Sequence, residues 1–323
     1  MPASGTEDLV REAISNLREA ADNGDPDAIA DLTKKTGGKA TTAPVAPDVA
    51  AMISPDKKVV RPNGETYVVR KLGIHDDVMA LRKAREDNIN VLLYGLPGTG
   101  KTALIEAAFC AGEDAGTVYT VQGTGDTITD DFVGGYWQDE EGHYHWAHGP
   151  MVLAMLEGRP FYIDEVALID PKVMALPYGL MDGRNELRIT QNPALGVIKA
   201  QPGFYVVAAC NPNAPGARMS EALLSRFSIQ AEVTTDMGLA RDLDVDPKLI
   251  TAINNLRRKR EKNIISWVPQ MREMLDFTKI KKSHGLIFAL RNLVATAPEQ
   301  DRKEVGGTVS RQFAKPVTAL TVD

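Results

Sequence analysis

The sequence predicts an α/β fold, in which a parallel sheet flanked by helices carries β-hairpin insertions and is followed by a C-terminal α-helical lid. Strand-like and helix-like segments alternate between residues 90 and 233, which is the pattern of a parallel sheet with helices on both faces. After Thr235 the strand-like segments stop and helical patterns follow. The 323 residues are 43% hydrophobic and 25% charged, which is typical of a globular protein long enough for two packed units.

The elements of the core follow from their local patterns. A Pro62-Asn63-Gly64 turn between Val59–Val60 and Tyr67–Val69 predicts a short hairpin, and a helix is predicted over Asp76–Glu86. The five strands of the sheet are expected at Asn90–Tyr94, Thr117–Gln122, Phe161–Ile163, Phe204–Cys210 and Ser228–Val233.

Two further hairpins are predicted inside the core. Aromatic and polar residues alternate around a Glu-Gly turn over Tyr136–Trp146, and a second pair of strands is expected at Glu186–Ile189 and Gly196–Lys199. The lid helices are expected at about Leu239–Lys262, Pro269–Phe277 and Ser283–Ala295.

The chain divides into four parts. Residues 1–32 are predicted to form an N-terminal helical element, because Ser4 and Glu7 fit a capping box and apolar residues then recur at helical spacing. Residues 33–58 are rich in Thr, Ala, Pro, Gly and Lys, which predicts a flexible linker. Residues 59–235 are the expected α/β core and residues 236–323 the expected lid.

Composition argues against a membrane protein and against a disulfide scaffold. The longest apolar runs, such as Phe204–Cys210, have the length of a strand, and the N-terminus shows no signal-peptide pattern. We therefore expect a cytoplasmic protein that does not contact a membrane. Cys110 and Cys210 fall in a predicted helix and a predicted buried strand, so both are expected to be core residues.

The net charge of −6 conceals an asymmetry between the two parts. Residues 236–323 contain 16 Lys/Arg and 11 Asp/Glu, which leaves 21 Lys/Arg and 32 Asp/Glu for the remainder. The basic excess centres on Arg257–Arg260. Such a cluster suits nucleic acid, an acidic partner or a solvated surface, and the sequence leaves these alternatives open.

A glycine-rich segment carries the first chemical signal. Gly95–Thr102 has the pattern Gly-x-x-x-x-Gly-Lys-Thr, follows a predicted strand and opens an Ala-rich helical stretch, Ala103–Ala111. In that setting the backbone closes around a β-phosphate, Lys101 reaches the β/γ oxygens and Thr102 ligates Mg²⁺. The sequence thus predicts ATP and Mg²⁺ as cofactors. The expected nucleotide contacts are Gly95, Pro97, Gly98, Thr99, Gly100, Lys101, Thr102 and Ala103.

An acidic pair follows a second strand. Phe161–Ile163 ends in Asp164 and Glu165. In a phosphate-loop ATPase we expect this strand to lie beside the strand that feeds the loop, so that its carboxyl end points at the nucleotide. Asp164 is then predicted to help hold Mg²⁺, and Glu165 to orient or deprotonate the attacking water.

Polar residues after the next strand complete the predicted site. Asn211, at the tip of Phe204–Cys210, is suited to sense the γ-phosphate or the attacking water. Arg226 ends a short helix just before the last strand, where a guanidinium offered from a neighbouring subunit can offset charge on the transferred phosphoryl group. Arg218 lies close in sequence and remains the competing candidate.

In this order, the motifs resemble those of the AAA+ ATPases. Further features resemble the MoxR branch, particularly its NorQ/CbbQ/GvpN-like members, and the resemblance covers about residues 66–295. These features are Thr127 through Gly134-Gly135-Tyr136, then Gly149–Met155, and Leu180–Gly183.

The resemblance implies roles for individual residues. Asp164 and Glu165 become the Walker B pair, Asn211 the first sensor, and Arg226 a finger that acts across a subunit boundary. The second sensor of the family is an arginine early in a lid helix. Arg272 fits this place, although Pro269-Gln270-Met271 departs from the usual small, polar start. The family also forms rings, usually hexamers, in which a hairpin placed like Tyr136–Trp146 projects toward the pore.

The leading hypothesis is an ATP-hydrolysing, ring-forming motor with MoxR-like chaperone activity that remodels or assembles a client protein. Relatives often work with a von Willebrand factor A-domain partner.

The alternative is a nucleic-acid-processing motor, or a subunit of a DNA-processing or defence complex, in which Arg257–Arg260 contact phosphates. Asp139-Glu140-Glu141 makes the first pore hairpin acidic and opposes that alternative. A nucleotide-gated scaffold is a third possibility, which Glu165 opposes.

Three histidines lie close together near this hairpin. His143 and His145 would share one face of a strand, and His148 is near, so a metal site is geometrically possible. No cysteine joins them, and nothing else in the sequence supports such a site.

Overall fold

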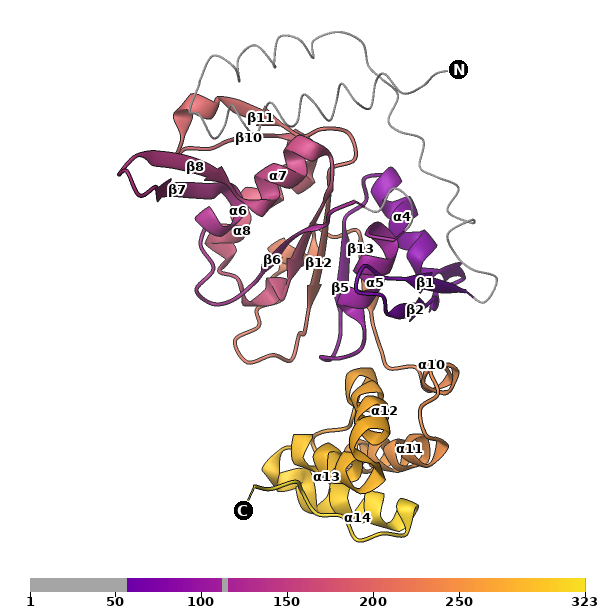
Figure 1. The fold of residues 1–323 in the computed structure, drawn as a ribbon. Coiled ribbons are helices and arrows are strands. Elements are labelled where there is room, and N and C mark those ends of the chain that lie inside the picture. The colour runs from indigo at the N-terminus through magenta and orange to yellow at the C-terminus, as the bar shows by residue number, and fades with distance from the viewer. Residues whose placement is uncertain (1–56, 112–115, 323) are drawn as a thin grey trace, which may run out of the picture.

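The computed structural model describes residues 57–111 and 116–322. The helical element predicted over residues 1–32, and the predicted linker up to residue 56, lie outside the described residues. Figure 1 shows an α/β core and, at one end of it, a separate group of C-terminal helices.

The core is built on one five-stranded sheet, and all four strand pairings are parallel. All five predicted strands are present, and the α/β class is confirmed. In spatial order the strands are β13 (Ile229–Glu232), β5 (Val91–Tyr94), β12 (Tyr205–Cys210), β9 (Pro160–Asp164) and β6 (Tyr119–Gln122).

The predicted neighbour of the phosphate-loop strand was wrong. The acidic strand β9 was expected beside β5, but β12 lies between them, and its Ala208 is in register with Leu92 on one side and Ile163 on the other. All six residues of β12 are buried. The longest apolar run therefore occupies the centre of the sheet, where both faces are covered by helices.

Alternate residues of the central strands enter two different cores. Leu92, Ile163 and Ala208 pack on the face covered by α7 (Pro150–Glu157), in a cluster that includes Met151. Val91, Leu93 and Val207 pack on the opposite face against α4 (Asp77–Glu86) and α5 (Lys101–Phe109). The sheet is thus the middle layer of a three-layer core.

Short elements connect these layers. They are α6 (Asp130–Val133), α8 (Pro171–Gly179), α9 (Glu221–Leu224), a π-helical turn η2 (Leu180–Arg184), and 3₁₀ turns η1 (Val166–Leu168) and η3 (Pro193–Leu195).

All three predicted hairpins are present. The pairs are β1 (Lys58–Val60) with β2 (Thr66–Val68), β7 (Gly134–Gln138) with β8 (Tyr144–His148), and β10 (Glu186–Arg188) with β11 (Val197–Lys199). A fourth, very short pair was not predicted: β3 (Lys71–Leu72) with β4 (His75–Asp76).

The lid is a five-helix unit with its own apolar core. Its elements are α10 (Met237–Asp242), α11 (Pro247–Glu261), α12 (Met271–His284), α13 (Leu286–Thr296), a 3₁₀ turn η4 (Glu299–Asp301) and α14 (Arg302–Phe313). Among residues 57–111 and 116–322, no helix has the length and apolar character needed to cross a membrane.

Two lid predictions were wrong. The single helix expected over Leu239–Lys262 is broken, because Asp244 has a left-handed φ of 57° and Asp246 caps a new helix by accepting the Lys248 N–H at 2.9 Å. Helix α14 was not predicted, and two central glycines lower its intrinsic helix propensity. The backbone at Gly306 packs close to Val294 and to the Val317 carbonyl, so tertiary contacts stabilise the helix.

Candidate nucleotide site

The phosphate loop runs from the carboxyl end of β5 into α5. A Cβ on Gly95 would lie 2.5 Å from the Val233 carbonyl oxygen, and a Cβ on Gly98 would lie 2.9 Å from the Arg272 Cβ. Both positions therefore require glycine, and both also have φ in the left-handed range. Helix α5 begins at Lys101, so its first N–H groups have no partner inside the helix and point toward the loop. This is a ready-made anion site.

The Lys101 ammonium lies within the loop that precedes it. It donates to the carbonyls of Gly95 at 2.9 Å and Leu96 at 3.1 Å, which leaves one of its three donors for another partner. Burial lowers the pKa of Lys101, and the nearby Glu165 and Asp164 carboxylates oppose that shift. The predicted phosphate contact is thus a buried cation held by the loop itself.

Oxygen atoms suited to Mg²⁺ gather beside this lysine. Thr102 Oγ1 lies 3.4 Å from the Tyr162 hydroxyl, on the second residue of α5. Asp164 lies near the Tyr162 hydroxyl, whose pKa is raised, first by burial and then by the charge of Asp164. A hydroxyl and a carboxylate form the hard oxygen donor set that Mg²⁺ prefers, so Thr102 and Asp164 fit the predicted ion. Tyr162, which links them, was missed by the sequence reasoning.

Glu165 and Asn211 are brought together at the ends of β9 and β12. Glu165 Oε2 accepts the Asn211 N–H at 3.1 Å, and the Glu165 N–H donates to Asp164 Oδ1 at 2.9 Å. Glu165 has φ 47° and ψ 40°, a conformation that costs a non-glycine residue on the order of 1–3 kcal/mol. Asn211 Oδ1 accepts the Asn213 N–H at 3.1 Å, so its side-chain NH₂ group is left to act as a donor.

The lid supplies an arginine to the same place. Arg272 is the second residue of α12, and its N–H donates to the Gly98 carbonyl at 3.1 Å. The N-cap of this helix is Gln270, whose N–H is bound by the Glu273 side chain at 2.7 Å. Glutamine thus occupies the place of the small polar residue that the family uses. No hydrogen bond or ion pair engages the Arg272 side chain within the described residues.

A cavity of about 370 Å³ lies between the core and the lid. Its lining includes residues 97–103 together with Asp164, Glu165 and Arg272. The remaining lining is both charged and apolar, so the cavity offers polar groups for phosphates and apolar groups for a flat base. The apolar lining residues are Val68, Leu239, Leu243, Met271 and Leu275.

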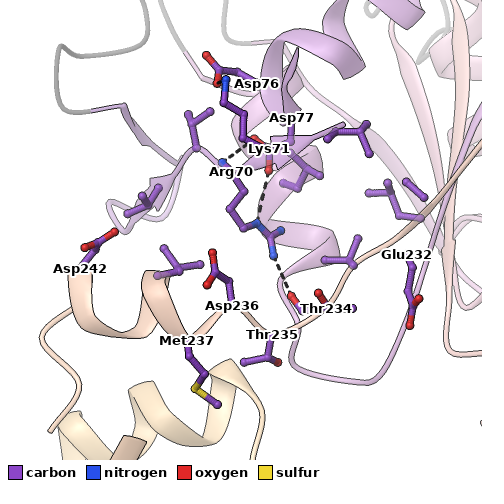
Figure 2. Close-up of a pocket in the computed structure, with 18 of the residues that line it drawn as sticks. Arg70, Lys71, Asp76, Asp77, Glu232, Thr234, Thr235, Asp236, Met237 and Asp242 are labelled. Carbon is purple, nitrogen blue, oxygen red and sulfur yellow. Dashed lines mark hydrogen bonds and ion pairs between the residues drawn. The ribbon is translucent and has the colours of Figure 1, made fainter. Parts of the chain in front are cut away.

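A second and larger cavity, of about 670 Å³, lies on the other side of Arg70 (Figure 2). Figure 2 shows Arg70 reaching from beside Asp77 toward Thr234, at the start of the lid linker. None of residues 95–103 lines this cavity, and neither Asp164 nor Glu165 does. The smaller cavity is therefore the candidate nucleotide site.

Arg70 joins the phosphate loop to the lid linker, and sequence reasoning missed it. Its Nη1 donates to the Thr99 carbonyl at 3.1 Å and to the Thr234 carbonyl at 3.4 Å. Its Nε donates to the Tyr67 hydroxyl at 3.0 Å and lies 3.5 Å from Asp77. An arginine next to a short hairpin gives no recognisable sequence signal, because its partners are mostly backbone carbonyls of distant segments.

Arg226 lies far from the phosphate loop of its own chain. Its carbonyl accepts from Asn90 at 3.4 Å, which places it at the amino end of β5, while the loop leaves the carboxyl end roughly 13 Å away along the strand. Its guanidinium pairs with Asp182 at 3.2 Å and lies over the Tyr178 ring. The structure does not bring Arg226 to the other predicted site residues.

Arg218, the competing arginine, precedes α9 in the chain. Its N–H donates to the Ala167 carbonyl at 2.7 Å, in the turn that follows Glu165. The Arg218 backbone therefore lies near the carboxyl end of β9, whereas Arg226 lies near the amino end of β5.

The histidines of the β7–β8 hairpin have other partners. His145 Nε2 lies 2.6 Å from Asp139 Oδ2, and the Trp146 indole N–H donates to His148 Nδ1 at 3.1 Å. In the part of the chain that the structure describes, no group of three or more His, Cys, Asp or Glu residues is arranged to hold a metal ion. Cys110 and Cys210 are both free thiols, half-buried and buried respectively.

Residues 90–227 match the family model of the AAA domain (dynein-related subfamily). An uncharacterised protein of Staphylococcus aureus strain USA300 is 31% identical over 213 residues, which cover 64% of this chain and 77% of that protein. This chain belongs to the AAA family. The AAA match contains the phosphate loop, the acidic pair, Asn211 and Arg226, and excludes Arg272 with the rest of the lid.

Other similar proteins are also uncharacterised. A Staphylococcus haemolyticus protein is 28% identical over 255 residues, which cover 74% of this chain and 94% of that protein. A Staphylococcus epidermidis protein is 37% identical over 148 residues, covering 44% of this chain, and the match spans 54% of its own length. A crystal structure of a provisionally named ATPase from Cytophaga hutchinsonii has a TM-score of 0.40 and 17% identity, covering 70% of this chain and 78% of that one.

Proposed function

We propose that this AAA protein hydrolyses ATP, assembles into rings and uses the resulting motion to remodel or assemble a partner protein. The placement of Glu165 carries the proposal. Its carboxylate is held by the Asn211 N–H at 3.1 Å, beside the Thr102 hydroxyl and Asp164 and at the mouth of the phosphate loop. A carboxylate there is placed to take a proton from an attacking water.

The other residues divide the work of phosphoryl transfer. Lys101 and the first N–H groups of α5 would bind the phosphates, and Arg272 would approach them from the lid. Thr102 and Asp164 would hold Mg²⁺, whose charge offsets the charge on the phosphate oxygens. The side-chain NH₂ of Asn211 would donate to the γ-phosphate or to the water.

The position of Arg226 supports the proposed ring. Because Arg226 lies at the opposite end of the sheet from its own phosphate loop, it would act on the site of another subunit. The MoxR-like chaperone role, the hexamer and a partner with a von Willebrand factor A domain belong to the same proposal, and the sequence resemblance supports them.

The basic cluster gives little support to a nucleic-acid motor. Arg257 donates to the Thr235 carbonyl at 3.0 Å, and Lys259 donates to Glu304 at 2.6 Å and to Thr308 at 2.9 Å. Two of the four residues are thus engaged inside the lid, which leaves Arg258 and Arg260 exposed. Two exposed cations contact fewer phosphates than four and give a weaker dependence of binding on salt.

Phosphate release and assembly, measured on the same samples, test the proposal. The wild-type chain should release phosphate from Mg·ATP and form a larger assembly by light scattering. Glu165→Gln should assemble and bind ATP while losing about a hundredfold or more of turnover. Lys101→Ala should lose ATP binding. A wild-type chain that stays monomeric and releases no phosphate at saturating Mg·ATP would refute the proposal.

A further inference from the structure

The β7–β8 hairpin presents aromatic side chains that residues 57–111 and 116–322 leave exposed. In Figure 1 it extends away from the sheet beyond α6. Tyr136 and Trp137 are each 54% exposed, and Tyr144 is 71% exposed. Tyr136 and Tyr144 lie on one face, because Tyr136 pairs with Trp146 and Tyr144 pairs with Gln138, while Trp137 lies on the other face. Exposed aromatics concentrated on one projecting element indicate a binding surface.

Internal contacts fix the shape of this surface. Tyr136 packs edge-on against Trp146 at 5.1 Å, and Trp137 lies 5.0 Å from the His145 ring. Asp139 pins the turn, because its Oδ1 accepts the N–H groups of Glu141 at 3.0 Å and His143 at 2.8 Å. The aromatic rings are therefore held in place before any partner binds, which reduces the entropy lost on binding.

The hairpin lies in a strongly acidic part of the chain. Residues 117–158 contain seven Asp/Glu and no Lys or Arg. Asp139 is occupied by the turn and by His145, but Glu140 and Glu141 are exposed at the tip. Glu141 lies 3.6 Å from His143 Nδ1, and no Lys or Arg occurs in this part of the chain. The surface thus combines aromatic rings with exposed carboxylates, a combination that attracts cations and repels phosphates.

We propose that the β7–β8 hairpin binds Lys- and Arg-bearing, extended segments of the client polypeptide. The inference rests on the proposed remodelling function and names the substrate class for it. Lys or Arg side chains would lie on Tyr136 and Tyr144, which share one face of the hairpin, by cation–π contact, while Glu140 and Glu141 attract the same charges. Tyr136 and Tyr144 are diagonal neighbours, roughly 7 Å apart, which matches the spacing of alternate residues in an extended chain.

Peptide binding to the full-length protein tests this inference. The probes are three fluorescent Gly/Ser-based peptides of equal length that carry Lys and Arg, Gln, or Glu at the same alternate positions. Fluorescence anisotropy should show binding of the cationic peptide alone. Tyr144→Ala should weaken it by about fivefold or more. Glu140→Gln with Glu141→Gln should weaken it at low salt and remove most of its salt dependence.

A matched control separates the local effect from net charge. Glu157→Gln with Glu299→Gln changes the charge equally at two exposed positions away from the hairpin tip, and should leave affinity within about twofold. Thermal melts establish that every variant is folded. Equal binding of all three peptides, affinity unchanged in the hairpin variants, or displacement of the peptide by a single-stranded oligonucleotide would overturn the inference.

Phosphate release is measured separately, so that the two proposals can fail separately. Hydrolysis without selective binding of the cationic peptide overturns the substrate class alone. Selective binding without hydrolysis overturns the motor and leaves the hairpin as a receptor for cationic segments.

Discussion

The two ends of the central sheet carry different parts of the chemistry. At the carboxyl ends, Lys101, Glu165 and Asn211 lie together, and Arg272 approaches them from the lid. At the amino ends lies Arg226, held by Asp182 and Tyr178. The first end gathers the candidate nucleotide-binding residues, whereas the second holds an arginine that is ion-paired with Asp182. Under the proposed function, the two ends of one chain would therefore belong to the sites of two different subunits.

Among substitutions at the two ends of the sheet, the largest loss of ATP turnover is expected at Arg226. Arg226→Ala should lower turnover by about a thousandfold, since a guanidinium that offsets transferred charge contributes effects of that size. ATP affinity should stay within about twofold, because the residue is remote from its own phosphate loop. Single-turnover hydrolysis and fluorescent-nucleotide titration measure the two quantities. Arg218→Ala is the comparison variant, and a larger loss there would move the assignment to Arg218.

Arg272 should behave differently, since it lies beside its own phosphate loop. Arg272→Ala is expected to weaken ATP binding about tenfold to a hundredfold, which corresponds to one lost charge-assisted hydrogen bond. Alanine keeps the Cβ that packs on Gly98, so the contact between lid and loop is preserved. An unchanged nucleotide affinity would remove Arg272 from the site.

A smaller effect is expected at Arg70, which holds the loop through the Thr99 carbonyl and also lines the candidate nucleotide cavity. Arg70→Lys loses the planar fork that spans the Thr99 and Thr234 carbonyls, so we expect KM to rise several-fold with a smaller change in kcat. Arg85→Lys is the matched control, because Arg85 also bridges two carbonyls, those of Gly203 and Gly158, at a distance from the site. It should lower the melting temperature without changing KM. Equal KM shifts in both variants would contradict a positioning role.

The smallest effect is expected at the ion pair between the first hairpin and the lid. Lys279 lies 2.7 Å from Glu65, and both side chains are about half exposed or more, so Glu65→Gln should cost about 1 kcal/mol or less. The pair holds the pKa of Glu65 below its usual value, so its stabilisation is present above the unfolded pKa and is lost as pH falls. Melting curves of wild type and variant should therefore converge in acid. A difference that grows in acid would contradict this.

The local parts of the fold were predictable from the sequence. Alternating apolar strands and turn residues located all five strands and three hairpins, because each depends on neighbouring residues. The order of the strands in the sheet was not predictable from local patterns. Strand β12 lies between β5 and β9, where its long apolar run is buried. Helix α14 was missed for a similar reason, because the packing of Gly306 close to Val294 and Val317 stabilises a helix that its two glycines weaken.

The candidate site likewise contains residues that could be predicted from the sequence and residues that could not. Glycine, lysine and paired carboxylates at strand ends have a chemistry that the sequence displays, and the structure brings Lys101, Asp164, Glu165 and Asn211 together. Tyr162 was not predictable, because its hydroxyl is identified only by its neighbours Thr102 and Asp164. The position of Arg226 at the opposite end of the sheet also required the strand register.

Mixing two inactive variants tests the division of the site between subunits most directly. Lys101→Ala keeps Arg226 but cannot bind ATP, whereas Arg226→Ala keeps the phosphate loop but lacks the arginine. Phosphate release should be absent from either variant alone and should return in part when the two are combined, since a mixed interface has both parts intact wherever the Arg226→Ala chain supplies the loop and the Lys101→Ala chain supplies the arginine. Failure to regain turnover in mixtures shown to co-assemble, or hydrolysis by Arg226→Ala alone at the wild-type rate, would contradict the account.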